Sequence, residues 1–455
     1  MDGLRLGYIE RNGLEYLENT DLSKLNNFSA LNAEAVAQAA GLFGTPVYIY
    51  DEGLILRKCR QCLDIPNAYG VSVRYAMKAN SNRNLLRLIT SAGLHLDASS
   101  LNEAVRAHMA GVPYDSIMLT TQEVYAGPEM SRLQELLLEG LKYNVCSLRQ
   151  LSLIRDFAAD NGLAPGIRIH PGIGSGESAT RNTGDDYACF GIHLSDVDEA
   201  VGIAGERGLK FRHIHEHIGS GADSGMWRQN IDLELSIIGK YFPDAGTVCF
   251  GGGLKEARMP DEAPADICLL GSYAKEKIIE FFDKTGRKLH VEIEPGTYIV
   301  ANSGYVVTRV IDKKSTSRSN FIVTDGGMEI NARPLLYGSR HPVYIVSSDG
   351  KRVRYSDFHD TCGDYSAVVA GKCCESGDCQ TLAPEGHSVP RAMAEPDIGD
   401  FAVIGGAGAY CSSMAPFNYN SHTQIPEALY TSDGDLKLIR RRQTLAQILE
   451  NEIDI

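Results

Sequence analysis

The sequence lacks the features that would place the chain in a membrane or on nucleic acid. It has no uninterrupted apolar run of about 18 residues, the length that a membrane-spanning helix needs. It has no basic excess, since its formal net charge is −14 and nucleic-acid binders carry a basic footprint. Its first residues, Met1 to Arg5, lack the apolar core of a signal peptide. We therefore expect a cytoplasmic protein that binds neither membranes nor nucleic acid.

The cysteines follow no disulfide or zinc pattern. There are 11 of them, an odd number scattered along a long chain, so we expect free thiols in a reducing compartment. Cys59 and Cys62 form a C-x-x-C pair, but they fall in a helix-like segment, which is wrong for a thioredoxin-type site. Cys373, Cys374 and Cys379 fit no four-ligand zinc spacing. We therefore predict no metal site.

What the sequence does contain is a long alternation of short apolar runs and helix-length segments. A chain of 455 residues predicts two domains. Regular β–α alternation between Ser72 and Glu294 predicts a parallel sheet, and eight units over about 220–250 residues predict a closed (β/α)₈ barrel. An open doubly wound sheet is the alternative. The expected strands begin near Val73, Leu94, Ile117, Tyr143, Ile167, Arg212, Thr247 and Leu289; expected helices include 82–92, 101–110, 148–159 and 269–282.

The texture changes after Glu294 to β-rich runs separated by turns, with a short closing helix expected at 445–452. This predicts a mostly β second domain, and the strand-like segment 4–16 could complete it. We expect residues 1–45 to join the β domain, residues 46–300 to form the barrel and residues 301–455 to form the β domain. The β-rich runs are 305–310, 321–323, 343–346, 367–369 and 401–404.

Lys78 follows the first barrel strand, in the stretch Arg74 to Asn80. A lysine at the end of a buried strand is costly unless its amine has a function. One such function is to hold an aldehyde cofactor as a Schiff base, and burial would make the amine more nucleophilic. A solvated surface lysine is the alternative.

Other polar residues also fall at expected strand ends, where barrel enzymes carry their catalytic groups. Glycines after the seventh strand would let backbone amides approach a phosphate. His213, His215 and His217 alternate, which allows a metal site, but we prefer His217 as a face stacked on a cofactor ring. Glu294 could pair with a pyridine nitrogen or with a barrel arginine. The strand-end residues are Asp97, Arg168, His170, His217, Gly251 to Gly253 and Glu294.

These residues resemble the diaminopimelate decarboxylase family, from about Thr45 to the end of the chain. The resemblance implies a pyridoxal 5′-phosphate enzyme with an alanine-racemase-like barrel and a β domain. The motifs that carry it are Tyr75 to Asn80, His217 to Gly221, Gly251 to Leu254, Glu294 to Gly296, Arg333 to Tyr337, Cys374 to Asp378, Gly408 to Tyr410, Asn418 to Ser421 and Leu438 to Thr444.

The resemblance also implies a role for each matched residue. Lys78 would hold the cofactor, His217 would stack on its ring and Glu294 would pair with its nitrogen. Cys374 would be a proton donor that reaches the site of a neighbouring subunit in a head-to-tail homodimer. The phosphate would be held by Ser220, Gly253, Gly296 and Tyr410; Asp97, Gly252 and Thr297 would also line the cofactor; and Arg333, Tyr337, Glu375 and Tyr410 would bind substrate.

Three positions depart from the family pattern, all around the substrate end of the expected pocket. Thr297 stands where the family has an arginine that helps to hold a substrate carboxylate, and a threonine cannot make that bidentate pair. His170 and Cys189 are the other two. We expect decarboxylation of meso-diaminopimelate to lysine. The alternatives are a paralogous decarboxylase for another amino acid or amine-tagged precursor, and a non-catalytic cofactor-binding protein.

Overall fold

The computed structural model describes two strands near the N-terminus, residues 8–11 and 14–17, and then residues 31–174, 182–221, 223–259, 261–355, 365–383 and 386–455. It divides into two compact units. One unit comprises residues 56–255 and 264–299, and the other comprises residues up to 55, 256–263 and 300–455. Among the described residues, no helix is both long and apolar enough to cross a membrane.

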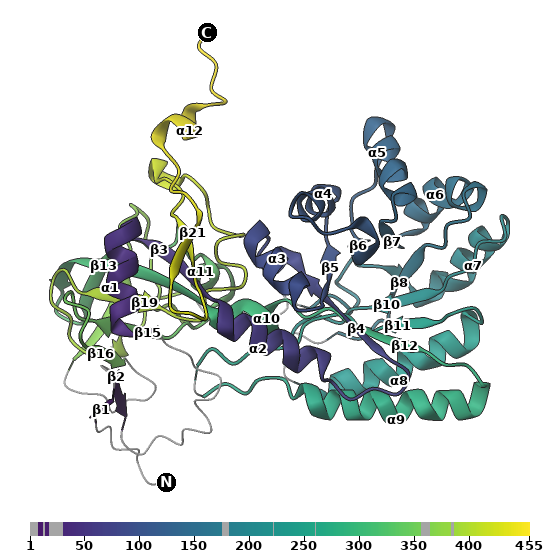
Figure 1. Ribbon diagram of the computed structural model, residues 1–455, viewed down its shortest axis with the longest axis horizontal. Helices are drawn as coiled ribbons and strands as arrows, with labels where there is room; N and C mark the ends of the chain where they lie inside the picture. Colours follow the sequence, from purple (N-terminus) through teal and green to yellow (C-terminus); the bar gives the residue numbers. More distant parts are fainter. Residues whose placement is uncertain are drawn as a thin grey trace. The chain divides into compact units, whose positions relative to one another are not determined.

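The first unit is a closed barrel of eight parallel strands, as the sequence predicted (Figure 1). The barrel closes because β12 pairs with β4 and β8 pairs with β10. This closure excludes the open doubly wound sheet. A further short strand, β9 (Ile192–His193), pairs with β8 alongside the barrel. The barrel strands are β4 (Val71–Ala76), β5 (His95–Ala98), β6 (Ile117–Thr120), β7 (Lys142–Val145), β8 (Gly166–His170), β10 (His213–Glu216), β11 (Thr247–Cys249) and β12 (His290–Ile293).

Helices follow the strands and surround them in Figure 1. Several begin at a side-chain cap directly after a strand: Ser100 and Ser147 accept backbone N–H groups of the first turns of α4 and α6. The apolar face of each helix is buried, as in α3, where Leu85, Leu86 and Ile89 are covered. The helices that follow barrel strands are α3 (Arg83–Ser91), α4 (Leu101–Met109), α5 (Gly127–Leu138), α6 (Leu148–Asp160), α7 (Val197–Gly205), α8 (Ser224–Tyr241) and α9 (Ile267–Thr285); α2 (Glu52–Leu63) precedes β4, and α10 (Thr297–Val300) follows β12.

The second unit is built on a 12-stranded mostly antiparallel sheet. The N-terminal segment expected to complete this domain contributes two strands rather than one, since β1 and β2 form a hairpin and β2 pairs with β16. The strands are β1 (Tyr8–Arg11), β2 (Leu14–Leu17), β3 (Val47–Asp51), β13 (Gly304–Ser315), β14 (Asn320–Thr324), β15 (Val343–Val346), β16 (Val353–Tyr355), β17 (Ser366–Ala370), β18 (Arg391–Ala392), β19 (Phe401–Ile404), β20 (Glu427–Tyr430) and β21 (Leu436–Arg440). The short helices are α11 (Arg333–Tyr337) and α12 (Leu445–Leu449).

The chain is divided differently from the expected limits. The sequence division began the barrel at residue 46, but β3 lies in the β sheet, where it pairs with β13 and β20. Residues 256–263 also belong to the β unit. A helix that the sequence reading did not anticipate, α1 (Ala33–Phe43), packs Val36 and Ala39 into the core of this sheet. The apolar alternation of β3 is short, so its partner sheet could not be read from its sequence.

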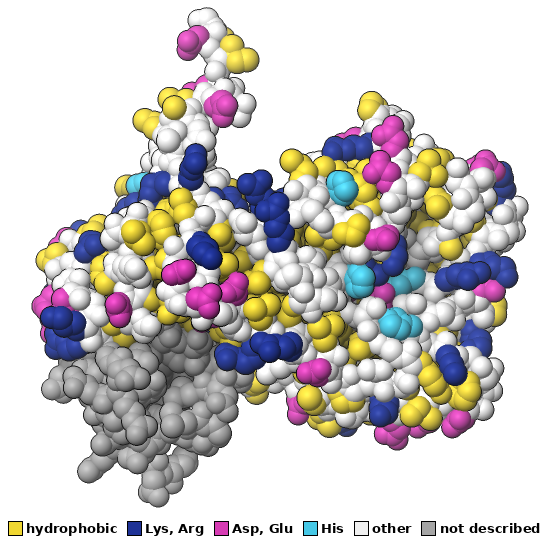
Figure 2. Space-filling model, viewed as in Figure 1, with side chains coloured by type: hydrophobic (Ala, Val, Ile, Leu, Met, Phe, Trp, Pro, Cys, Tyr) yellow, Lys and Arg dark blue, Asp and Glu magenta, His cyan; other side chains and the backbone are white. Residues whose placement is uncertain are grey.

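Acidic and basic side chains are interspersed over the face shown in Figure 2.

Candidate active site

Lys78 lies at the mouth of the barrel, in a 3₁₀ turn, Met77–Ala79, directly after β4. A backbone hydrogen bond from Ala76 N to Pro295 O (3.3 Å) joins this strand end to the end of β12. Met77 and Ala79 are buried, whereas the Lys78 side chain is exposed. The Lys78 side chain is therefore more exposed than the argument from burial assumed. An accessible amine at the mouth remains suited to an aldehyde partner.

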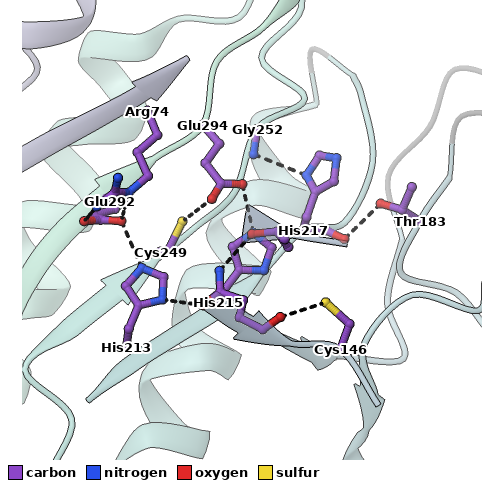
Figure 3. Close-up of polar contacts among 12 residues, drawn as sticks. Arg74, Cys146, Thr183, His213, His215, His217, Cys249, Gly252, Glu292 and Glu294 are labelled. Atoms are coloured by element: carbon purple, nitrogen blue, oxygen red, sulfur yellow. Dashed lines mark hydrogen bonds and ion pairs between the residues drawn. The ribbon is translucent and has the colours of Figure 1, made fainter. Parts of the chain in front are cut away.

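Glu294 directly follows β12 and is buried within the barrel (Figure 3). Its Oε2 lies 2.8 Å from Nε2 of His215, and its Oε1 accepts a hydrogen bond from the thiol of Cys249 at 3.4 Å. Burial alone would raise the pKa of Glu294, but His215 and the neighbouring histidines outweigh it and lower the pKa. The carboxylate is therefore charged and fixed in orientation.

Arg74, one of the barrel arginines that could have paired with Glu294, has a different partner. Arg74 donates from Nε and Nη2 to Glu292, at 2.8 and 3.0 Å. The third contact of Glu292 is His213 Nε2, at 2.9 Å. Glu292 and Glu294 are two residues apart, so their side chains lie on the same face of the chain and form two successive layers in the barrel. Each carboxylate contacts its own histidine, and Glu294 is the one nearer the barrel mouth.

His217 follows β10 on the same end of the barrel. Its Nδ1 accepts the backbone N–H of Gly252 at 3.3 Å, and its carbonyl accepts the hydroxyl of Thr183 at 2.9 Å (Figure 3). Burial, with help from Arg168 and Lys78, lowers the pKa of His217 well below its usual value. A neutral imidazole held through Nδ1 keeps its proton on Nε2 and offers a flat face without a charge.

The glycines at the strand ends are packed too tightly for any side chain. A Cβ on Gly253 would collide with the carbonyl of Gly219, and a Cβ on Gly252 would collide with that of Glu294. Gly253 also has a φ of 87°, which disfavours other residues. Gly221 N donates to Gly253 O at 3.1 Å, which ties the two loops together. Ser220 lies between these contacts, and Gly296 packs against Ala76 and Ala79.

Asp97 is the residue before the last of β5 (His95–Ala98) and is buried, and its Oδ1 has no hydrogen-bond partner in the part of the chain that the structure describes. Burial and the charge of Glu294 raise the pKa of Asp97, while Lys78 opposes the shift. Asp97 therefore lies within the electrostatic reach of both residues. Thr297 begins α10 directly after Gly296, at the same end of the barrel.

The β unit holds a second group of the expected residues. Arg333 is buried, and its guanidinium carbon lies 5.4 Å from the ring centre of Tyr337 and 5.8 Å from that of Tyr410. Nη2 donates to Ser339 Oγ at 3.2 Å, while the buried Nε has no hydrogen-bond partner among the described residues. A buried guanidinium with an unused donor beside two aromatic rings suits a carboxylate ligand.

Cys374 lies on a tight loop of the β unit. Asp378 holds this loop, since its carboxylate accepts the backbone N–H groups of Met328 and Cys373, each at 2.6 Å. The Cys374 side chain is exposed, and its backbone N–H donates to Asn420 at 2.9 Å. The next residue, Glu375, accepts the hydroxyl of Tyr419 at 3.2 Å, and the N–H of Gly377 first of all lowers the pKa of Glu375. The thiol and the carboxylate are therefore presented outward by a fixed loop.

His170 and Cys189, two of the positions that depart from the family pattern, line the same cavity in the barrel unit. The cavity has a volume of about 580 Å³ and is also lined by Arg149 and His193. His170 Nε2 lies 3.0 Å from the carbonyl of Ala188, and the rings of His170 and His193 are 5.5 Å apart.

Sequence reasoning missed the support beneath Glu294. It placed His213 and His215 in the barrel without partners, and it assigned no role to Cys249. The sequence contains the pattern His-x-His on β10 and Glu-x-Glu at the end of β12. Only the folded barrel fixes the register of β10 against β11 and of β11 against β12, and this register decides which of these side chains meet. Two sets of these side chains have donor atoms close enough for a metal ion, His213–Cys249–Glu292 and His215–Cys249–Glu294. His217, the third histidine of the alternation, belongs to neither.

Pyridoxal phosphate fits the residues at the barrel mouth. The exposed amine of Lys78, the neutral ring of His217, the charged Glu294 and the side-chain-free glycine loops match its aldehyde, ring, ring nitrogen and phosphate.

Comparison with known proteins gives the same result. Residues 53–301 match the family model described as pyridoxal-dependent decarboxylase, pyridoxal binding domain. The chain is 33% identical to diaminopimelate decarboxylase of Streptomyces coelicolor, over 93% of each chain. It is 32% identical to the enzyme of Escherichia coli K12, over 93% of this chain and 97% of that one. A crystal structure of diaminopimelate decarboxylase, 31% identical, superposes with a TM-score of 0.83 over 94% of this chain and 98% of that one. The chain therefore belongs to the diaminopimelate decarboxylase family of pyridoxal-dependent decarboxylases.

Proposed function

We propose that this pyridoxal-phosphate enzyme removes one carboxylate of meso-diaminopimelate to form lysine. The observation that carries the proposal is the meeting of Lys78, His217 and the supported Glu294 at one end of the barrel. The relatives named diaminopimelate decarboxylase support the choice of substrate. A Helicobacter pylori diaminopimelate decarboxylase, 25% identical with a TM-score of 0.76, was solved with L-lysine and supports the product.

The geometry of each residue supports its proposed role. Pyridoxal phosphate, when bound, supplies a ring that withdraws electrons from the substrate carbon. Lys78 holds the cofactor covalently through its amine, and His217 covers a ring face. Glu294, charged in the buried interior, holds a proton on the ring nitrogen. The backbone around Ser220, Gly253 and Gly296 surrounds the phosphate, where side chains would block its approach.

The residues of the β unit would serve the substrate. Arg333 binds its distal carboxylate through the unused Nε, beside Tyr337 and Tyr410. Glu375 binds the distal amine. Cys374 donates a proton to the carbon that has lost carbon dioxide, which general acid–base groups accelerate by about 10²–10⁴-fold. We propose that Cys374 and Glu375 do this in the site of a second subunit, in a homodimer with shared sites.

A decarboxylase for a related amino acid is the second candidate. Thr297 favours it, because a threonine stands where the resemblance places a carboxylate-binding arginine. We propose that meso-diaminopimelate is accepted but bound more weakly than an arginine at this position would allow.

Release of carbon dioxide from a panel of amino acids tests the proposal. The panel contains meso-diaminopimelate, lysine, ornithine and arginine, each supplied with the holoenzyme. We expect release from meso-diaminopimelate and formation of lysine in equal amount. Turnover of another panel member alone would support the second candidate, and a cofactor-loaded protein inert toward all four would contradict both.

A further inference from the structure

Cys249 is a fully buried thiol at the end of β11, and no step above uses it. On the neighbouring strand, Glu292 is its register partner and Glu294 lies two residues further on. Its sulfur lies with the acceptor atoms of both carboxylates, since each three-residue set containing Cys249 has its donor atoms within 4.8 Å of one another. The thiol therefore sits between the two layers of the barrel interior (Figure 3).

The thiol of Cys249 donates its hydrogen bond to one of the two carboxylates, that of Glu294. Glu292 is already satisfied by two donors of Arg74 and by His213, at 2.8 to 3.0 Å. Glu294 has one donor from His215, and the hydrogen bond from Cys249 Sγ goes to its other oxygen, Oε1, at 3.4 Å. Burial first, and then the charges of Glu294 and Glu292, raise the pKa of Cys249 well above its usual value. The sulfur therefore keeps its proton and is a donor.

We propose that Cys249 is a positioning residue that orients Glu294 toward the cofactor's ring nitrogen. With His215 on Oε2 and Cys249 on Oε1, each carboxylate oxygen has its own hydrogen-bond donor, and the two contacts together restrict rotation of the carboxylate plane. The lone pairs that remain on the two oxygens would be available to the ring nitrogen of a bound cofactor. This inference rests on the proposed pairing of Glu294 with the ring nitrogen.

The test measures how much the ring nitrogen contributes to the affinity of the apoprotein for the cofactor. Apoprotein is titrated with pyridoxal phosphate and with a deaza analogue in which carbon replaces the ring nitrogen, and the ratio of the two Kd values is the readout. We expect Cys249→Ala to reduce the preference for the natural ring by about threefold to tenfold, the value of one hydrogen bond. Cys249→Ser, which keeps a donor, should hold the preference within about twofold of wild type.

Packing and positioning give different results in this measurement. A thiol that only fills space would weaken both ligands equally in Cys249→Ala and leave the ratio unchanged, which would overturn the proposal. Thermal midpoints of the apoproteins confirm folding, and Cys249→Val replaces the alanine variant if that variant does not fold. Glu294→Gln should abolish the preference. A changed ratio in Glu294→Gln with an unchanged ratio in Cys249→Ala overturns the role of Cys249 alone, whereas unchanged ratios in both overturn the proposed pairing of Glu294 as well.

Discussion

Single side chains carry the chemistry of the barrel mouth, and their protonation states follow from their surroundings. The buried His215 and Cys249 both donate to Glu294, so that a charged carboxylate persists in the interior. Glu292 is held in the same way by Arg74 and His213. A buried charge is tolerated only when it is paired and hydrogen-bonded. The two layers of acid and base are therefore a structural requirement as well as a chemical one.

Lys78→Ala should abolish covalent attachment of the cofactor, because the amine at the end of β4 is removed. The visible absorbance of the lysine-linked cofactor and its fixation by borohydride, mapped by mass spectrometry, measure the attachment. Lys210→Ala is the control, since Lys210 is exposed and pairs with Asp244 at 2.8 Å. Wild-type attachment in the Lys78 variant would show that another amine holds the cofactor.

Thr297→Arg should raise kcat/KM for meso-diaminopimelate by at least about tenfold, because it restores a charge-assisted hydrogen bond to a substrate carboxylate. Thr297→Gln is the matched control, since a neutral side chain of similar length cannot supply the charge. Steady-state carbon dioxide release measures both variants. A wild-type kcat/KM above about 10⁴ M⁻¹s⁻¹ on this substrate would argue against the expected weakness.

At the scale of elements, β10 and α8 carry three buried polar side chains that take no part in the hydrogen bonds to Glu292 and Glu294. His213 and His215 project into the barrel, so Glu216, on the alternate face of β10, projects toward the helices. Glu234 and Asn230 lie one turn apart on α8. All three side chains are fully buried, and their polar atoms have no hydrogen-bond partner among the described residues.

Burial raises the pKa of both Glu216 and Glu234 well above the usual value. The folded protein therefore retains protons that the unfolded chain has released, and the free energy of unfolding falls as the pH rises above about 4.3. The slope is about 1.4 kcal/mol per pH unit for each group until the folded pKa is reached. The double variant Glu216→Gln/Glu234→Gln should remove this fall in the free energy of unfolding with rising pH.

Urea midpoints measured between acid and mildly alkaline pH test this prediction. We expect the double variant to gain stability over wild type as the pH rises. Glu199→Gln, on the exposed face of α7, is the control and should parallel wild type. Parallel curves for the double variant as well would show that the two carboxyls ionise without cost in the folded protein.

At the scale of the whole molecule, the expected residues fall into two groups, one in each compact unit. The barrel carries the residues that we propose to bind the cofactor, and the β unit carries Arg333, Cys374 and Glu375. The homodimer proposed above would combine the barrel group of one chain with Cys374 and Glu375 of the other chain.

Mixing two inactive variants tests this arrangement. Lys78→Ala and Cys374→Ala should each be inactive or slow, and together they should recover about a quarter of the wild-type activity. Random exchange makes half of the dimers mixed, and each mixed dimer has one intact site. Lys78→Ala mixed with Glu294→Gln is the control, because both changes lie in the barrel group and no intact site forms. Absence of recovery despite demonstrated subunit exchange would place each complete site within one chain.

The sequence by itself determined the barrel, the order of its strands and the residues at their ends. Regular alternation of apolar runs and helical segments is a local property, so eight strands could be counted before their pairing was known. Lys78, His217, the glycines and Glu294 could be identified because they directly follow strands and stand in short motifs. The β-rich texture after Glu294 likewise indicated the second domain.

Only the tertiary structure decided which sheet receives β3 and which side chains meet inside the barrel. Strand β3 pairs with β13 and β20, which lie more than 250 residues away in the sequence, and no local pattern records such a partner. Cys249 and Glu294 come from neighbouring strands, and their contact depends on the register between β11 and β12. Periodicity shows which way a side chain points, but the register of strands decides what it touches.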